Sequence, residues 1–408
     1  MNNHDTPSST FRARLGDPRH PGFLPQDRRL ARIRPGQNPF VSDTPLPENA
    51  PTFFGRMDTL REILATLRHP DKPGCVSLSG ERRIGKSSLL NQVFAALGKE
   101  ENLISIFANA QGWHERYSTV DFFADLHRTI DEVLPKVQGA FSPSPINYSE
   151  FRDFIEEKAE ENYRFVLILD EFDTIAANPR FNATFFDNLR HLGSTPEHAF
   201  GFLLASQRSL AELKERHQEF DGSSFGNIFG SAHILGLLQP EETQALMQEP
   251  WQKTPQGSPP LSEQEISKIE QRVNRHPAFI QIIMEKQWIA RQQNSSLDWE
   301  RIIKLESGKD LELLWQDRTP EEIKILLKIA KNEPLTEEDL SEEVILLDLR
   351  TRGLITEDNR LFTEMLGEFI PDDVIEKTKP SKKAFDGILK WAKKAGRIRN
   401  AWKSDNSR

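Results

Sequence analysis

The sequence of 408 residues predicts an α/β fold built on a parallel sheet, and three observations carry that prediction. Short apolar runs typical of strands alternate with stretches of helical periodicity through the first 240 residues. A glycine-rich loop at residues 80–88 stands between one such strand and one such helix. Asp170 and Glu171 directly follow a continuous apolar run, which is typical of a strand covered by helices on both faces.

The predicted elements follow in order along the chain. Five apolar runs are expected to be the strands of the sheet: residues 75–78, 103–108, 164–169, 200–205 and 232–237. Amphipathic spacing predicts helices over residues 58–67, 87–97, 119–134 and 149–160. Beyond residue 240 the pattern is helical, and a capping box at residues 262–265 opens one of these helices.

The loop reads Gly-Glu-Arg-Arg-Ile-Gly-Lys-Ser-Ser and fits the pattern G-x-x-x-x-G-K-[ST] at every fixed position. Gly80 and Gly85 permit backbone angles at which successive N–H groups turn toward an anion. Lys86 supplies a positive charge for terminal phosphates, and the Ser87 hydroxyl can ligate magnesium. The pattern predicts binding of ATP with Mg²⁺ by the whole loop: Gly80, Glu81, Arg82, Arg83, Ile84, Gly85, Lys86, Ser87 and Ser88.

Polar side chains also follow two of the predicted strands, at the sheet edge where ligands bind in open α/β folds. We expect Asp170 to hold Mg²⁺, directly or through water, and Glu171 to act as the general base on the attacking water. The alternative is an acidic turn after a buried strand. Arg208 follows the fourth strand and is expected either to reach charge developing on the γ-phosphate or to be a solvated loop arginine.

The formal net charge of −9 is unevenly distributed. Residues 1–40 carry +4 and residues 377–408 carry +9, which leaves −22 for the residues between them. In the C-terminal tail, apolar residues recur at helical spacing among the basic ones: Phe385, Ile388, Leu389, Ala392, Ala395, Ile398 and Trp402. A basic amphipathic helix can lie on an anionic membrane, bind nucleic acid, enter a partner's groove or dock on the acidic body of its own chain.

Composition and periodicity divide the chain into five parts. They are a flexible basic arm, an ATPase core, a helical lid, a winged-helix domain and a basic amphipathic tail, expected at residues 1–37, 38–240, 241–310, 311–372 and 373–408. The winged-helix prediction rests on the order helix, short helix, helix and hairpin over residues 319–371. This segment has a net charge of −7, which favours a packing or interaction role over DNA binding.

Residues 38–371 resemble the P-loop ATPases of the STAND class, close to the AAA+ origin-recognition-like and archaeal ATPases. The resemblance rests on six short motifs and the winged-helix pattern. The motifs are Asn-Pro-Phe at 38–40, Phe-Phe-Gly-Arg at 53–56, the phosphate loop, Asp170-Glu171, Ser206-Gln207-Arg208 and His276-Pro277.

This resemblance implies a five-stranded parallel sheet with the phosphate-loop strand at its centre. It implies that Phe54 and Arg56 lie near adenine and that Pro277 touches the base or ribose from the lid. It also assigns Arg208 to the arginine that follows the fourth strand in such proteins. Some relatives grip the ADP phosphate with a winged-helix histidine, and residues 319–371 contain no histidine.

The leading hypothesis is an ATP-dependent molecular switch that binds MgATP, hydrolyses it slowly, gates an unidentified protein partner and forms a homo-oligomer on ATP binding. An alternative is a DNA-dependent AAA+ ATPase of the origin-recognition or transposition-helper type, which binds nucleic acid through the basic arm and tail. A third hypothesis is a signalling ATPase that uses the tail on an anionic membrane. The single cysteine, Cys75, and the lack of a signal segment predict a cytoplasmic protein.

Overall fold

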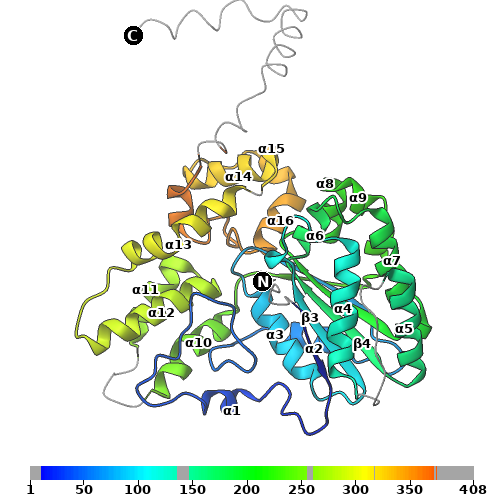
Figure 1. The fold of residues 1–408 in the computed structure, drawn as a ribbon. Coiled ribbons are helices and arrows are strands. Elements are labelled where there is room, and N and C mark those ends of the chain that lie inside the picture. The colour runs from blue at the N-terminus through cyan, green and yellow to red at the C-terminus, as the bar shows by residue number, and fades with distance from the viewer. Residues whose placement is uncertain (1–10, 136–146, 255–260, 317, 372–373, 375–408) are drawn as a thin grey trace, which may run out of the picture.

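The computed structural model describes residues 11–135, 147–254, 261–316 and 318–371, together with residue 374. A sheet flanked by helices occupies one half of the molecule, and a group of helices occupies the other (Figure 1). The sheet has the order β1-β3-β4-β5-β2-β6. Its strands are β1 (Phe11–Leu15), β2 (Cys75–Gly80), β3 (Leu103–Asn109), β4 (Arg164–Asp170), β5 (Phe200–Ser206) and β6 (Ser231–Leu235).

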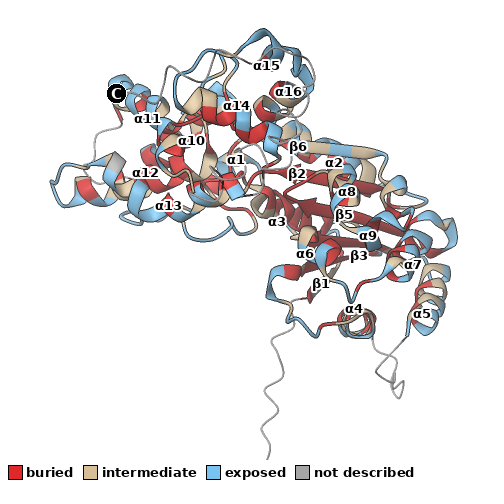
Figure 2. Ribbon diagram, turned by 90° about the horizontal axis from the view of Figure 1, so that it is seen from above, coloured by how far each residue is buried: buried red, intermediate tan, exposed pale blue. Residues whose placement is uncertain are grey.

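The inner strands are apolar because both faces of the sheet are covered. In β4, Phe165, Leu167 and Leu169 enter one hydrophobic core. The alternate residues Val166 and Ile168 enter the core on the opposite face. Strands β4 and β5 are buried almost throughout their lengths (Figure 2). The predicted α/β class with a mostly parallel sheet is confirmed.

Two layers of helices sandwich this sheet. One face is covered by α2 (Met57–Leu67) and α3 (Lys86–Leu97). The other face is covered by α4 (Thr119–Val133), α5 (Tyr148–Glu160), α6 (Phe172–Ala177) and α7 (Ala183–Ser194), together with the short helices α8 (Leu210–Arg216) and α9 (Gln218–Asp221). The four long helices of the predicted core therefore form as the apolar spacing indicated.

The sheet differs from the predicted one in two respects. A sixth strand, β1, pairs antiparallel with β3, while the five predicted strands pair in parallel. The phosphate-loop strand β2, expected at the centre, lies between β5 and the edge strand β6. The loop therefore opens near one edge of the sheet, beside the helical half of the molecule (Figure 1).

Residues 11–30 are packed on the body through β1 and α1, whereas the sequence predicted a flexible arm over residues 1–37. Strand β1 extends the sheet, and α1 (Gln26–Leu30) follows it. The buried Arg29 donates hydrogen bonds to the carbonyl oxygens of Leu24 at 3.1 Å and Ala50 at 3.0 Å. Arg14 pairs with Glu48 at 2.9 Å. Arg14 and Arg29 therefore make contacts within the chain. Local sequence patterns do not reveal such contacts, because the partners are distant in the sequence.

The helical half is built from α10 (Pro240–Gln252), α11 (Glu263–Val273), α12 (Pro277–Gln292), α13 (Trp299–Gln316), α14 (Pro320–Ala330), α15 (Glu337–Ser341) and α16 (Glu343–Thr351). An antiparallel bridge joins Ile355 and Leu361. Helix α13 runs through residue 310, where the sequence placed a domain boundary. The predicted basic tail, apart from residue 374, lies outside the described residues.

Candidate nucleotide-binding site

The phosphate loop connects β2 to α3, so its amides sit at the N-terminal end of a helix of 12 residues. Gly80 is required by close packing, because a Cβ atom there would lie 2.7 Å from the carbonyl oxygen of Leu235. Gly85 has φ of 104°, in the left-handed region that favours glycine, and directly precedes the helix. A helix N-terminus with inward-facing amides is a site for anions such as phosphate.

Lys86 is buried at the start of α3. Its Nζ donates to the carbonyl oxygens of Gly80 at 2.8 Å and Glu81 at 3.0 Å. Burial lowers the pKa of Lys86, while the carboxylates of Glu171 and Asp173 raise it. The ammonium is therefore held over the loop by two neutral oxygens, which phosphate oxygens can replace with stronger, charge-assisted bonds.

The acidic pair lies at the carboxyl end of β4, opposite the loop. Asp170 is 1% exposed, and burial raises its pKa while the Ser87 hydroxyl and Lys86 lower it. Glu171 lines the cavity described below and has φ of 57° and ψ of 46°. A left-handed conformation is uncommon for a residue other than glycine, and such strained residues cluster at functional sites.

These groups fit a magnesium ion. The Oδ2 atom of Asp170 is buried and has no hydrogen-bond partner among the described residues, and the Ser87 hydroxyl is close enough to bond the same carboxylate. No group of three or more His, Cys, Asp or Glu side chains in the described part of the chain could hold a metal. Mg²⁺ uses one or two protein ligands when phosphates and water complete its shell, so Asp170 and Ser87 suffice.

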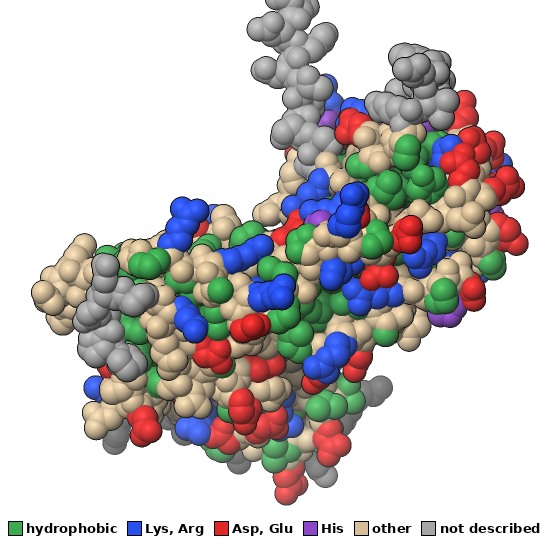
Figure 3. Space-filling model, turned by 90° about the horizontal axis from the view of Figure 1, so that it is seen from below, with side chains coloured by type: hydrophobic (Ala, Val, Ile, Leu, Met, Phe, Trp, Pro, Cys, Tyr) green, Lys and Arg blue, Asp and Glu red, His purple; other side chains and the backbone are tan. Residues whose placement is uncertain are grey.

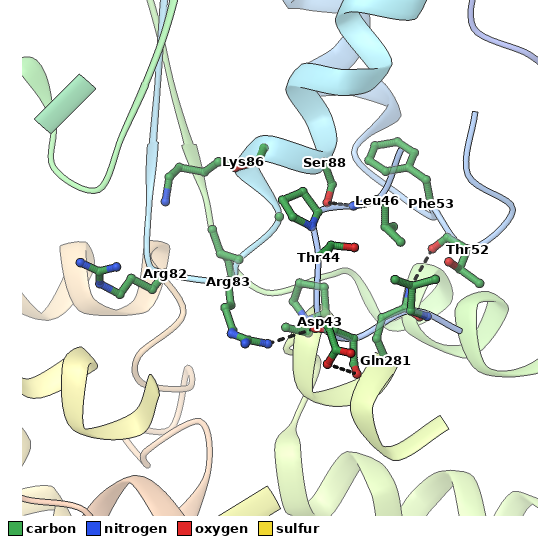
Figure 4. Close-up of a pocket in the computed structure, with 18 of the residues that line it drawn as sticks. Asp43, Thr44, Leu46, Thr52, Phe53, Arg82, Arg83, Lys86, Ser88 and Gln281 are labelled. Carbon is green, nitrogen blue, oxygen red and sulfur yellow. Dashed lines mark hydrogen bonds between the residues drawn. The ribbon is translucent and has the colours of Figure 1, made fainter. Parts of the chain in front are cut away.

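A cavity of about 360 Å³ opens beside the loop. Its walls come from residues 41–46 and 52–56, from the loop, and from the first turns of α12, and Phe54, Arg56 and Pro277 are among its lining residues. Figure 4 shows Lys86 and Arg82 on one side of this space and Thr52 and Phe53 on the other. An apolar wall beside a polar phosphate end is the arrangement that a nucleotide requires.

Arg56 is fixed in the wall of this cavity by backbone contacts. Its guanidinium donates to the carbonyl oxygens of Gly236 and, at 3.4 Å, of Leu237, and its own N–H donates to Glu242 at 3.0 Å. Burial lowers the pKa of Arg56 to about 10. The arginine therefore ties the segment before α2 to the start of α10, besides lining the cavity.

Sequence reasoning missed several residues of the site. Gln281, one turn after Pro277, donates to the Thr52 carbonyl oxygen at 3.2 Å (Figure 4). Leu46 also lines the cavity, and its N–H donates to the Oγ of the predicted loop residue Ser88 at 3.0 Å. The helical spacing of Pro277 and Gln281 was a usable signal, because residues four apart share a face. No sequence pattern indicated the contact between Leu46 and Ser88.

The loop is also held from the helical half by Arg83. The Nε of Arg83 lies 2.7 Å from Asp310 of α13, and another nitrogen of the same guanidinium donates to the Ser42 carbonyl oxygen at 3.1 Å. Asp310 lines the cavity as well. The phosphate loop is therefore in direct contact with both the segment before α2 and the helices after the sheet.

Arg208 lies apart from the residues that line the cavity. It is 1% exposed, and its guanidinium lies 2.8 Å from Glu212 and 3.4 Å from Glu322. Its backbone N–H and that of Gln207 approach Asp173, at 3.4 and 2.8 Å. The predicted reach of Arg208 toward a γ-phosphate is not present in this conformation. Gly80, Glu81 and Asp170 are likewise not among the residues that line the cavity.

Five buried charged residues from distant parts of the chain meet beside the loop, and we call them the junction cluster: Glu81, Arg208, Arg318, Glu322 and Arg352. Glu81 pairs with Arg318 and, at 2.5 Å, with Arg352. Glu322 lies 3.4 Å from Arg208, 3.5 Å from Arg318 and 3.2 Å from Arg352. The arginines lower the pKa of Glu81 to about 2 although burial opposes them. The second residue of the phosphate loop is thus ion-paired with the C-terminal helices.

None of the helices in the described part of the chain is both long and apolar enough to cross a lipid bilayer.

Comparison with known proteins agrees with this geometry. Residues 52–214 match the profile of the AAA ATPase domain family. Among solved structures, the Walker-type ATPase PABY2304 of Pyrococcus abyssi is similar with a TM-score of 0.55 and 16% identity, over 80% of this chain and 98% of that one. Among curated proteins, no relative matches the chain significantly.

Two further solved structures resemble the chain more loosely. The Aeropyrum pernix ORC2 protein, in its ADPNP–ADP complexes, has a TM-score of 0.49 and 17% identity, over 88% of this chain and 98% of that one. CDC6P from Pyrobaculum aerophilum has a TM-score of 0.45 and 16% identity, over 86% and 97%.

The sheet order, the loop between β2 and α3 and the acidic end of β4 agree with the match of the family profile. Residues 52–214 therefore combine an α/β fold and a phosphate loop with a match to the profile of the AAA ATPase domain family.

Proposed function

We propose that the protein is a molecular switch of the STAND type that binds MgATP, hydrolyses it slowly and uses the nucleotide to set the position of its C-terminal helices. One observation carries this proposal: Glu81 of the phosphate loop is ion-paired with Arg318 and Arg352, which stand 237 and 271 positions later in the chain. Any change in the loop on nucleotide binding acts directly on these arginines. The site and the C-terminal helices therefore form one mechanical unit.

The chemistry is assigned to the residues of the core. The loop amides and Lys86 bind the phosphates, and Phe54, Arg56 and Pro277 bind the base and ribose side of the nucleotide. Asp170 and Ser87 would hold Mg²⁺, which neutralises charge on the phosphates. Glu171 orients the attacking water and accepts its proton. Arg208 reaches the nucleotide only after it leaves Glu322, so its participation is coupled to opening of the junction cluster.

The energetics of the junction cluster suit a switch. Burying charges costs several kcal/mol for each ion, and the pairing recovers this cost only when the geometry is complete. The ion pairs of the junction cluster are consequently expected to form together and to break together. Lys86 connects the phosphate site to the junction cluster. It donates a hydrogen bond to the carbonyl oxygen of Glu81, and the side chain of Glu81 pairs with the arginines. Phosphates that draw Lys86 away would loosen both contacts.

The proposal is tested by comparing alanine variants of two arginines that lie two residues apart at the end of α16. Arg352→Ala removes a partner of Glu81, whereas Arg350→Ala removes a side chain that bonds Asn359 at 2.7 Å, away from the loop. We expect Arg352→Ala to release fluorescent ADP about tenfold faster than the wild type, and Arg350→Ala to leave the rate unchanged. Equal rates in the two variants, with both folded, would refute the coupling of loop and C-terminal helices.

A DNA-dependent ATPase that is gated by nucleic acid is the second candidate, and the net charge of +9 in residues 377–408 favours it. One face of the described part of the chain speaks against it. Basic and acidic side chains are intermixed on the face seen in Figure 3. ATP turnover with and without duplex DNA separates the candidates: severalfold stimulation supports the DNA-dependent enzyme, and indifference to DNA supports the switch.

A further inference from the structure

We propose that residues 377–408 dock, within their own chain, on an exposed apolar stripe formed by α15 and α16. The stripe consists of Leu340, Val344 and Leu347, which are 46%, 81% and 61% exposed. Val344 and Leu347 are three residues apart and share one face of α16, and Leu340 lies in α15, which ends at Ser341 just before α16 begins. This inference goes beyond the proposed switch and does not depend on ATP binding.

The stripe is not a normal surface for a folded protein. Large apolar side chains on the surface usually occur singly, and contiguous ones mark a contact with something else. Two other leucines of α16, Leu346 and Leu349, are 3% and 0% exposed. The helix therefore already buries one apolar face in the core. Its second apolar face is left for another element.

Charge around the stripe selects the partner. Residues 332–349 contain seven Asp and Glu residues and no Lys or Arg. Glu337, Glu338, Glu342 and Glu343 are all exposed, and of these Glu338 lies 3.4 Å from Lys324. Phosphate groups of DNA or lipid would be repelled from this surface. A segment that is both basic and apolar complements it.

The C-terminal tail has that chemistry, and it begins nearby. Residues 377–408 carry +9 and contain Phe385, Ile388, Leu389 and Trp402 at helical spacing. Val374, fully buried, belongs to the same hydrophobic core as Leu346 and Leu349 of α16. A helix over residues 381–408 would be about 42 Å long, which exceeds the length of α15 and α16 together. Both reach and complementarity therefore favour this segment of the chain itself.

Docking there would place the tail next to the junction cluster. Arg352 follows directly after the last residue of α16, so an element packed on α16 contacts the helix that carries it. The positive charge of the tail would also compensate the acidic residues that surround the apolar stripe. A ligand that removed the tail would act on the helix that positions Arg352.

The test uses the full-length protein and the rate at which trypsin cleaves within residues 377–408, followed by mass spectrometry. The variant Val344→Asp with Leu347→Asp alters only exposed positions. Its matched control is Leu305→Asp in α13, where the side chain is 75% exposed but lies outside the stripe. We expect about tenfold faster cleavage of the tail in the double variant and the wild-type rate in the control.

A second variant, Glu342→Gln with Glu343→Gln, keeps the apolar stripe and tests the charge. We expect it to speed cleavage as well, and to abolish most of the salt dependence seen in the wild type. Cleavage rates unchanged in both stripe variants would overturn the proposal. Protection that rises with protein concentration would also overturn it, because the tail would then dock on a second copy. Tail protection that appears only with DNA or anionic vesicles would overturn it too.

Discussion

The sheet and the junction cluster are held by different forces, although each connects segments that are distant in the chain. In the sheet, β4 buries five consecutive apolar residues, Phe165 to Leu169, each at 0% exposure. At the junction, the contacts are made by charged side chains that are buried just as deeply. Apolar packing is the sum of many weak contacts, whereas a buried ion cluster needs every partner in place. The sheet is consequently a permanent frame, and the junction is the part that can open.

The largest expected effect concerns ATP hydrolysis at the carboxyl end of β4, in the sheet. Replacing Glu171 with Gln removes the proton acceptor without changing the shape of the side chain. We expect ATP turnover to fall by about 10²–10⁴, with nucleotide affinity retained, because a positioned base contributes a factor of that size. Phosphate release and equilibrium binding of a fluorescent ATP measure the two quantities. Unchanged turnover would remove Glu171 from the mechanism.

The next effect concerns the phosphate end of the same frame. Lys86→Ala removes a cation that is expected to bond two phosphates, and bonds to charged groups contribute about 1.5–3 kcal/mol each. We therefore expect affinity for ATP to fall by about 100-fold or more. The control is Lys99→Ala, an exposed position just beyond the other end of α3. Tight ATP binding by the Lys86 variant would contradict the assignment of the site.

Removing a charge from the junction cluster should lower the free energy of unfolding much more than removing a charge from the surface. Glu322 contacts three buried arginines, while its neighbour Glu321 is exposed. We expect Glu322→Gln to lower the free energy of unfolding by about 3–5 kcal/mol, because it leaves buried charges uncompensated. Glu321→Gln should change it by less than about 0.5 kcal/mol. Urea denaturation of both variants measures the difference.

A Leu167→Ala substitution sharpens the contrast between the two regions. It removes apolar contacts from the sheet and is also expected to cost about 2–5 kcal/mol. It should not accelerate release of ADP, whereas Glu322→Gln should. If both variants accelerated release equally, general destabilisation rather than the junction would control the nucleotide.

The last effect, and a small one within any single pH unit, is a pH dependence at the contact between the N-terminus of α12 and Phe362. Burial lowers the pKa of His276 to about 3, with Arg56 adding to the shift and Glu81 opposing it. Between about pH 6.5 and pH 3 the unfolded chain therefore binds one more proton than the folded chain. Stability should fall on acidification through this window, by at most about 1.4 kcal/mol per pH unit from this group.

His276→Phe checks that dependence, because the ring stacks on Phe279 at 4.4 Å and on Phe362 at 5.2 Å. Phenylalanine preserves the stacking and cannot take up a proton. Urea midpoints measured above and below pH 6.5 should change less in this variant than in the wild type. An identical loss of stability on acidification would assign the effect to other groups.

Sequence reasoning succeeded where structure is determined locally. The five parallel strands and the loop from Gly80 to Ser88 follow from apolar runs and from a fixed motif, so both were predictable. Strand β1 was missed although Phe11, Ala13 and Leu15 alternate with arginines, because the run is only five residues long and lies in a stretch rich in Pro, Arg and Gly; it forms the edge of the sheet by pairing with β3. The contacts of Glu81 with Arg318 and Arg352 were hidden because these partners are distant in the sequence. The role of Glu81 lies in its side chain, and the motif constrains only its neighbours.

Hydrogen exchange of the Glu171→Gln variant, with ADP and with MgATP, tests the coupling of nucleotide and junction most directly. The variant is expected to hold ATP without consuming it, so the two states can be compared at equilibrium. We expect amides of α14 and α16 to lose protection with MgATP relative to ADP, while those of β4 and β5 remain unchanged. Equal protection of α14 and α16 in the two states, with both nucleotides bound, would contradict a switch that opens at the junction cluster.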